Sequence, residues 1–294
     1  MKKLLFSLDE PECLARPVNV ASVPQRSLFR YPGGKTWLVP LFRRWMASFP
    51  SKPSLLIEPF AGGGIIGLTA AFEALADKVL LVELDERVAA VWITTLNGDA
   101  GWLANTILNF DLNPDSALRL LNSKPSSTRD LALQTIVRNR TAHGGILADG
   151  AGVIKVGENG KGILSRWYPK TLSTRINLIS HIADRIEFIQ GDAFSVIEDK
   201  KKLASAAFFV DPPYTAGGKN AGSRLYTHSV IDHDQLFCSC SELKGDFLMT
   251  YDNSDEVCSL AKNYGFDTRP VSMKNTHHAE MKELLIGRDL SWVS

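Results

Sequence analysis

The sequence predicts an α/β protein built on a parallel, doubly wound sheet. Five stretches have the short apolar pattern of buried strands, at residues 54–58, 78–84, 185–190, 206–210 and 246–251. The first two are followed by helix-like stretches at residues 65–75 and 86–96. Strands that alternate with helices are typical of parallel sheets whose two faces are both covered.

A large insertion interrupts this alternation. Residues 97–184 contain helical patterns and then a glycine-rich stretch, HGGILADGAGVIKVGENGKG. Such a stretch is typical of turns and loops, and it lies between the second and third predicted strands. We therefore predict one domain formed by residues 1–96 and 185–294, with residues 97–184 inserted as a mainly helical region.

The composition is that of an ordinary globular protein. The 294 residues include 33 basic and 32 acidic side chains, a balance that neither favours nor excludes a nucleic-acid partner. Four cysteines are too few for a disulfide framework, and no stretch approaches the roughly 20 apolar residues of a membrane span. The pair Cys238 and Cys240 lacks a second pair of metal ligands. We expect a cytoplasmic monomer that has no metal site and does not associate with a membrane.

A glycine cluster follows the first predicted strand, in the stretch Glu58-Pro-Phe-Ala-Gly-Gly-Gly64. A strand, a glycine turn and a helix together let a ligand approach the backbone at a helix N-terminus. Gly62, Gly64 and Gly67 satisfy the pattern G-x-G-x-x-G, and Glu83 ends the next strand. A dinucleotide and S-adenosylmethionine both fit this pattern. The acid at Glu58 favours S-adenosylmethionine, because its sulfonium and amine are cationic whereas a pyrophosphate would be repelled.

The fourth predicted strand runs into Asp211-Pro-Pro-Tyr214. Two prolines cannot continue a strand, so the strand ends with a carboxylate, a stiff backbone and an aromatic ring. The Asp211 carboxylate and the Pro212 carbonyl can each accept one N–H bond from the exocyclic amine of adenine, which orients its lone pair toward a methyl donor. Tyr214 can stack on a base flipped out of a duplex. The alternative is a strand-ending turn without a role.

In these blocks, and in Phe29-Arg-Tyr-Pro-Gly-Gly-Lys35, the chain resembles the Dam-type (class alpha) DNA adenine-N6 methyltransferases. Weaker matches lie at residues 191–194, 250–254 and 283–286. Together the matches cover most of the chain outside the insertion. The resemblance implies a Rossmann-like S-adenosylmethionine-dependent methyltransferase sheet with an inserted target-recognition region. It further implies methyl transfer to a flipped-out adenine in double-stranded DNA.

The resemblance also implies roles for individual residues. The implied catalytic residues are Asp211, Pro212, Pro213 and Tyr214. The implied cofactor-binding residues are Tyr31, Lys35, Glu58, Phe60, Ala61, Gly62, Gly63, Gly64, Glu83, Asp85, Asp192, Ala193, Phe194 and Asp211. Lys35 would pair with the cofactor carboxylate, and either Glu83 or Asp85 would hold its ribose. Asp192 would bind the cofactor adenine, although a helix N-cap is its simpler alternative.

The insertion is the expected DNA-binding region. Residues 138–175 contain seven basic and two acidic side chains, which suits contacts with phosphates. The candidates for the DNA face are Arg138, Arg140 and Arg166, with Trp167 and Tyr168 as wedging or stacking residues. The alternative is a solvated basic surface with both aromatic rings in a local core.

Other reactions share some of these features with adenine-N6 methylation of DNA. An RNA adenine methyltransferase would share the same catalytic logic. An NAD-dependent oxidoreductase would explain the glycine pattern but not the blocks at residues 29–35 and 211–214. Cytosine-N4 methylation usually uses a related tetrapeptide that begins with Ser, and cytosine-C5 methylation needs a Pro-Cys dipeptide that this sequence lacks.

Overall fold

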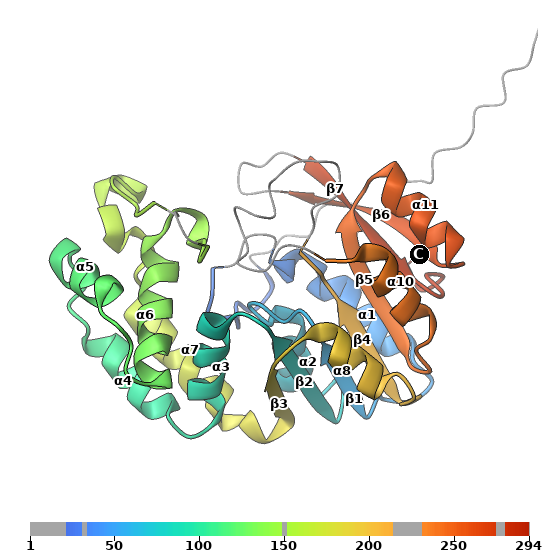
Figure 1. The fold of residues 1–294 in the computed structure, drawn as a ribbon, viewed down its shortest axis with the longest axis horizontal. Helices are drawn as coiled ribbons and strands as arrows, with labels where there is room; N and C mark the ends of the chain where they lie inside the picture. Colours follow the sequence, from blue (N-terminus) through green and yellow to red (C-terminus); the bar gives the residue numbers. More distant parts are fainter. Residues whose placement is uncertain (1–21, 31–33, 149–151, 214–230, 275–279, 294) are drawn as a thin grey trace, which may run out of the picture.

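The computed structural model describes residues 22–30, 34–148, 152–213, 231–274 and 280–293. A seven-stranded sheet forms its centre, in the order β3-β2-β1-β4-β5-β7-β6 (Figure 1). The strands are β1 (Leu55–Glu58), β2 (Lys78–Glu83), β3 (Ile186–Gln190), β4 (Ala206–Val210), β5 (Asp246–Asp252), β6 (Asp267–Lys274) and β7 (Glu280–Gly287).

Strands β1 to β5 pair in parallel, whereas β7 runs antiparallel to both β5 and β6. This is the doubly wound strand order of Rossmann-like sheets, with the antiparallel strand β7 inserted between β5 and β6. The predicted fold class, an α/β protein with a Rossmann-like sheet and an inserted, mainly helical region, is confirmed.

Alternate residues of the central strands pack on opposite faces of the sheet, as the two-residue period of a strand requires. On β4, Ala207 and Phe209 belong to one apolar cluster, and Phe208 and Val210 belong to the other. All five residues of β4 are buried, which explains the continuous apolar run in the sequence.

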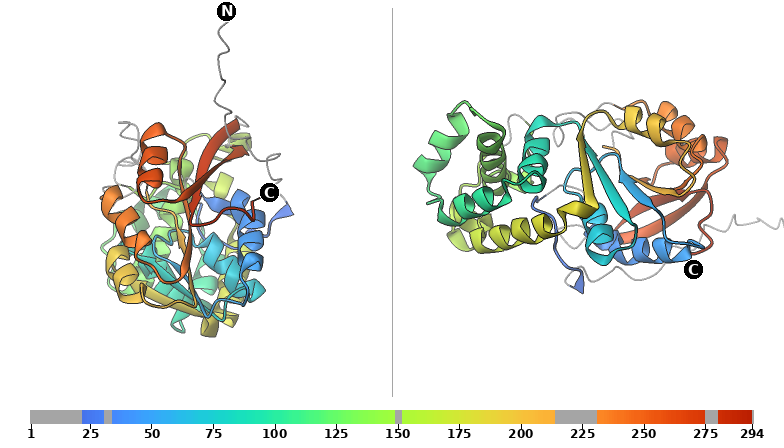
Figure 2. Two further views of the ribbon diagram at one scale, coloured as in Figure 1. Left: turned by 90° about the vertical axis from the view of Figure 1, so that its right-hand side faces the viewer. Right: turned by 90° about the horizontal axis from the view of Figure 1, so that it is seen from below.

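Helices cover both faces of the sheet, as the two views of Figure 2 show. The first cluster includes residues from α1 (Val39–Ser48), α2 (Ile65–Glu73) and α3 (Glu86–Leu96). The second includes residues from α8 (Ala193–Lys200), α10 (His233–Ser241) and α11 (Asp255–Asn263).

The inserted region is a helical lobe beside the β3 edge of the sheet (Figure 1). Its α-helices are α4 (Ala100–Asn109), α5 (Pro114–Asn122), α6 (Thr128–Thr141) and α7 (Pro169–His181). Short 3-10 turns are η3 (His143–Gly145), η4 (Glu158–Gly160), η5 (Gly162–Arg166) and η6 (Ala183–Arg185). Ile136 of α6 and Ile176 of α7 belong to the same apolar cluster as α3, so the lobe shares a core with one face of the sheet.

Among the residues that the structure describes, no helix combines the length and the apolar character that crossing a bilayer would take.

Candidate active site at the carboxyl edge of the sheet

The loop between β1 and α2 is shaped by glycines. Gly62 and Gly64 have φ angles of 46° and 60°, in the left-handed region that favours glycine. A Cβ atom added to Gly64 would lie 2.7 Å from Cζ2 of Trp92, and the Trp92 indole N–H donates to the Gly62 carbonyl at 3.0 Å. Helix α2 then starts at Ile65 without a side-chain cap. Its first N–H groups are suited to an electronegative group of a ligand.

Glu58 ends β1 beneath this loop and is only 3% exposed. Its Oε2 accepts a hydrogen bond from the Gly67 N–H at 2.7 Å, in the first turn of α2. A Cβ atom at Gly67 would lie 2.7 Å from that same oxygen, so the third glycine of the pattern keeps room for the carboxyl group. Burial raises the pKa of Glu58 well above its usual value, and the nearby Asp211 charge raises it further.

Glu83 and Asp85, the two candidates for the ribose, have different surroundings. Glu83 lies at the end of β2 and accepts hydrogen bonds from the N–H groups of Gly62 and Asp85, each at 2.9 Å. Burial raises its pKa to about 7. Asp85 is the N-cap of α3, where it accepts from the N–H groups of Arg87 at 2.8 Å and Val88 at 3.3 Å. Both carboxylates therefore accept two backbone N–H bonds, and both stay candidates for the ribose.

The segment after β3 reaches the same edge. The Gly191 N–H donates to the Glu83 carbonyl at 3.0 Å, which places this turn beside one of the two ribose candidates. Asp192 is exposed and caps α8 by accepting from the Ser195 N–H at 2.8 Å. The alternative considered for Asp192, a helix N-cap, is therefore present in the structure. Phe194 is half-buried in the first turn of that helix.

Asp211 follows β4 and is held from two sides. Its Oδ1 accepts a hydrogen bond from the Thr250 hydroxyl at 2.7 Å and lies 3.1 Å from Nζ of Lys35. Thr250 belongs to the neighbouring strand β5 and is fully buried, and Pro212 is buried as well. Tyr214, the predicted stacking residue, lies outside the described residues.

Lys35 is a buried residue, only 3% exposed, rather than a surface lysine beside a turn. Besides Asp211, its Nζ lies 3.4 Å from Oε2 of Glu283, which belongs to β7. Burial raises the pKa of Glu283 to about 7, although Lys35 lowers it. The predicted partner of Lys35 was the cofactor carboxylate. In this structure its Nζ pairs with two carboxylates of the chain itself. Tyr31 lies outside the described residues.

Sequence reasoning did not single out Thr250 or Glu283 as parts of the site. Both fall in weak matches to the resembled family, without an assigned role. Thr250 lies near the end of the predicted strand at residues 246–251, whereas Glu283 lies in the middle of β7. Their contacts with Asp211 and Lys35 depend on how β4, β5 and β7 pair. The remaining predicted loop residues, Phe60, Ala61 and Gly63, lie between β1 and α2 as expected.

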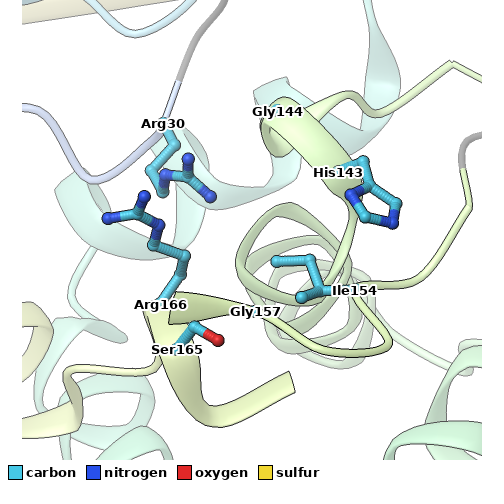
Figure 3. Close-up of a pocket in the computed structure, with 7 residues that line it drawn as sticks. All are labelled: Arg30, His143, Gly144, Ile154, Gly157, Ser165 and Arg166. Atoms are coloured by element: carbon cyan, nitrogen blue, oxygen red, sulfur yellow. The ribbon is translucent and has the colours of Figure 1, made fainter. Parts of the chain in front are cut away.

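Three arginines were predicted to face DNA, and for Arg140 this prediction is wrong because its side chain is buried. It is 5% exposed, and its guanidinium donates to the Leu28 carbonyl in the interior. Burial lowers its pKa to about 9, and the charges of Arg175 and Arg30 add to this effect. Arg138 and Arg166 are half-buried, and Arg166 lines a cavity (Figure 3).

The two aromatic residues that follow Arg166 differ in their surroundings. Trp167 packs edge-on against Phe110, with ring centroids 6.0 Å apart, as in the alternative of a local core. Tyr168 is 49% exposed, and its hydroxyl donates to the Ser165 carbonyl at 3.0 Å.

The glycine loop and the Asp211 turn meet at one place in the sheet. The loop follows β1, the turn follows β4, and these two strands are parallel neighbours. Strand order reverses between β1 and β4, and open α/β sheets bind ligands outside the carboxyl ends of the strands at such a switch point. The arrangement can therefore hold one ligand over the glycines and a second group against Asp211.

No protein-family model and no curated protein matches this sequence. Among solved structures, an rRNA methyltransferase (AviRa) from Streptomyces viridochromogenes is 14% identical, with 94% of each chain covered and a TM-score of 0.40. A provisionally assigned RNA methyltransferase from Pyrococcus horikoshii is 10% identical, with 91% of this chain and 92% of that chain covered and a TM-score of 0.40.

A precorrin-6y C5,15-methyltransferase from Geobacter metallireducens is 9% identical, with 84% of this chain and 86% of that chain covered and a TM-score of 0.35. These likenesses are distant and concern the fold alone. The functional argument therefore rests on the strand order and on the residues of this chain.

Proposed function

We propose that this protein is an S-adenosylmethionine-dependent DNA methyltransferase that modifies the N6 amine of adenine. The observation that carries the proposal is the meeting of the glycine loop and the Asp211 turn at the switch point between β1 and β4. One motif suits a nucleotide cofactor, and the other suits an exocyclic amine.

The residues around the glycine loop fit S-adenosylmethionine. The left-handed Gly64 and the uncapped start of α2 offer backbone N–H groups without side chains in the way. Glu58 provides a buried carboxyl group for a cationic ligand, and Glu83 or Asp85 provides a second one for ribose hydroxyls. When bound, the cofactor supplies an electrophilic methyl group whose sulfonium is a good leaving group.

Asp211 is the residue that would act on the amine. Its carboxylate accepts one N–H bond of the adenine amine, and the Pro212 carbonyl accepts the other, so that the nitrogen lone pair faces the methyl group. Thr250 and Lys35 fix the orientation of the carboxylate through contacts at 2.7 and 3.1 Å. A preorganised acceptor of this kind costs little reorganisation when charge develops on the amine.

Double-stranded DNA is the substrate that we propose, because the inserted lobe is rich in basic residues between positions 138 and 175. An adenine reaches Asp211 only after leaving the base stack. The adenine amine looks the same in RNA, so an RNA substrate is an outcome that the test must be able to detect.

The test is a nucleoside analysis. The purified protein is incubated with methyl-labelled S-adenosylmethionine and, separately, with unmethylated duplex DNA and with RNA. The products are digested to nucleosides and separated by mass. We expect label in N6-methyl-deoxyadenosine with the wild type and none with Asp211→Asn. Label in N4-methyl-deoxycytidine, or in RNA alone, would contradict the proposal.

A further inference from the structure

Glu283 is a buried carboxyl group close to the proposed catalytic carboxylate. It lies on β7, and its side chain is only 9% exposed. Its Oε2 lies 3.4 Å from Nζ of Lys35, and the same Nζ lies 3.1 Å from Oδ1 of Asp211. Lys35 therefore joins the carboxyl group of β7 to the carboxylate that is proposed to accept the adenine amine.

Strand pairing places Glu283 on the face of the sheet that carries Lys35. Glu283 pairs with Asp252 of β5 on one side and with Val271 of β6 on the other. Directly paired residues point to the same face, and so do residues two apart on one strand. Val271 and Leu285 belong to the apolar cluster that includes α1 and α2, so Glu283 points to that face. The 3-10 turn η2 (Lys35–Leu38) contributes residues to the same cluster.

The charges around Glu283 are mostly acidic. Those that act on it are Lys35 of η2, Asp211 after β4 and Asp252 of β5, and its neighbour on β6 is the apolar Val271. Burial raises the pKa of Glu283 to about 7; Lys35 lowers this pKa, and the charges of Asp211 and Asp252 raise it. Burial also raises the pKa of Asp252. As the pH rises through 7, Glu283 ionises and adds one negative charge beside Lys35.

Ionisation of Glu283 changes the effect of Lys35 on Asp211. Lys35 is only 3% exposed, and a buried ammonium group needs a carboxylate close by. While Glu283 is protonated, Lys35 cancels much of the charge of Asp211, which weakens Asp211 as a hydrogen-bond acceptor. Once Glu283 is ionised, it shares the ammonium charge, and Asp211 keeps more of its own charge. During methyl transfer, positive charge moves from the sulfonium to the amine nitrogen, where a stronger acceptor stabilises the transition state.

We infer that Glu283 is a positioning residue for the methyl transfer, which acts through Lys35 to strengthen Asp211 as the acceptor of the adenine amine. Glu283 makes and breaks no covalent bond in this role. The alternative is that Glu283 only stabilises a buried lysine, in which case the rate of methyl transfer would not follow its ionisation. The inference rests on the proposed function, because it requires an amine that reacts beside Asp211.

The test measures the rate of a single methyl transfer as a function of pH. Each protein, in excess and saturated with labelled S-adenosylmethionine, is mixed with a duplex that the wild type methylates, and the reaction is stopped at short times. Single-turnover conditions separate the chemical step from product release. In Glu283→Gln the side chain keeps its size and an oxygen that can accept from Lys35, but it cannot ionise. The control is Glu187→Gln, because Glu187 is exposed on β3.

In the wild type we expect the rate to rise between about pH 6 and pH 8 and then to level off, as Glu283 ionises. Glu283→Gln should lose this rise and react roughly three- to thirtyfold more slowly at pH 8. A charge two contacts away, which acts more strongly on the amine than on the sulfonium, has an effect of this order at an effective dielectric constant of about 20. At pH 5 the two proteins should react at nearly the same rate. Glu283→Asp should recover part of the rise, and Glu187→Gln should match the wild type throughout.

A second measurement follows the carboxyl group without the reaction. The protein is labelled with carbon-13 at the side-chain carboxyl groups of glutamate and titrated by NMR, with neither DNA nor cofactor present. A signal that titrates near pH 7 in the wild type should be absent from Glu283→Gln and present in Glu187→Gln. If Glu283→Gln loses no such signal, Glu283 does not ionise in this range and the inference fails.

Three further results would overturn the inference. Equal rates and equal pH profiles in the wild type and Glu283→Gln would mean that Glu283 has no part in the reaction. A loss of the same size at pH 5 and pH 8 would indicate a packing role that is independent of charge. A loss confined to the affinity for cofactor or DNA would indicate a role in binding. If the wild type transfers no methyl group to adenine, the proposed function fails, whereas methylation that is independent of Glu283 refutes this inference alone.

Discussion

Replacing Glu283 by glutamine should change how stability depends on pH. The Glu283 side chain is 9% exposed, and burial raises its pKa from 4.5 to about 7. Because the folded state binds this proton more tightly than the unfolded state, the carboxyl group favours folding at low pH. That contribution is complete below about pH 4.5 and is lost as the pH rises to 7. At about 1.4 kcal/mol per pH unit between the two pKa values, the loss is about 3 kcal/mol.

The assay is urea unfolding of the wild type and Glu283→Gln at pH 5 and pH 8. Relative to the wild type, the variant should be more stable at pH 8 than at pH 5, by up to about 3 kcal/mol in the difference. Glu187→Gln is the control, because Glu187 is exposed on β3. A stability difference that is equal at both pH values would refute the reasoning that Glu283 is a buried group that ionises near neutral pH.

Three further predictions concern the proposed cofactor loop and Asp211, the proposed catalytic carboxylate. Asp211→Ala should abolish methyl transfer and leave S-adenosylmethionine binding largely intact by calorimetry; full activity would contradict the mechanism. Gly64→Ala should lower the unfolding free energy by about 1–3 kcal/mol more than Gly265→Ala, because both have positive φ but only Gly64 faces a ring at 2.7 Å. Cofactor binding should release protons, because a cationic ligand favours the ionised carboxylates of Glu58 and Glu83, whose pKa values burial raises. Calorimetry in buffers of different ionisation enthalpy measures this release, and a heat that is independent of the buffer would contradict it.

The predicted strands of the sheet agree closely with the structure, because buried parallel strands carry continuous apolar runs. The predicted strand at residues 206–210 is β4 itself, and the stretch 246–251 is one residue shorter than β5. Strand β6 was missed. Its sequence DTRPVSMK contains a proline and several polar residues, which is typical of an edge strand and weakens the strand pattern.

The predicted glycine loop was recognisable because all of its determinants are local in the sequence. The cluster of Lys35, Asp211 and Glu283 could not be found in the same way, since it joins a 3-10 turn (η2, Lys35–Leu38), the end of β4 and strand β7. Its formation depends on the pairing of β5 with β7, which no local pattern encodes.

The wrong expectation for Arg140 has a local explanation. Charge alone suggested an exposed side chain, but Arg140 follows Ile136 and Val137 by four and three residues, on the buried face of α6. The apolar pair one helical turn earlier was the one local signal that favoured burial, because the helix as a whole has little apolar periodicity. A guanidinium at such a position is stabilised by hydrogen bonds to backbone carbonyls, as with Leu28 here.

The most direct test of the proposed reaction is a map of modified bases in unmethylated genomic DNA after incubation with the protein and S-adenosylmethionine. Single-molecule sequencing identifies both the modified base and its sequence context. We predict N6-methyladenine within one short motif, present with the wild type and absent with Asp211→Asn. DNA that stays unmodified, although the cofactor binds and the protein is folded, would contradict the assignment of Asp211 and Pro212 to adenine methylation.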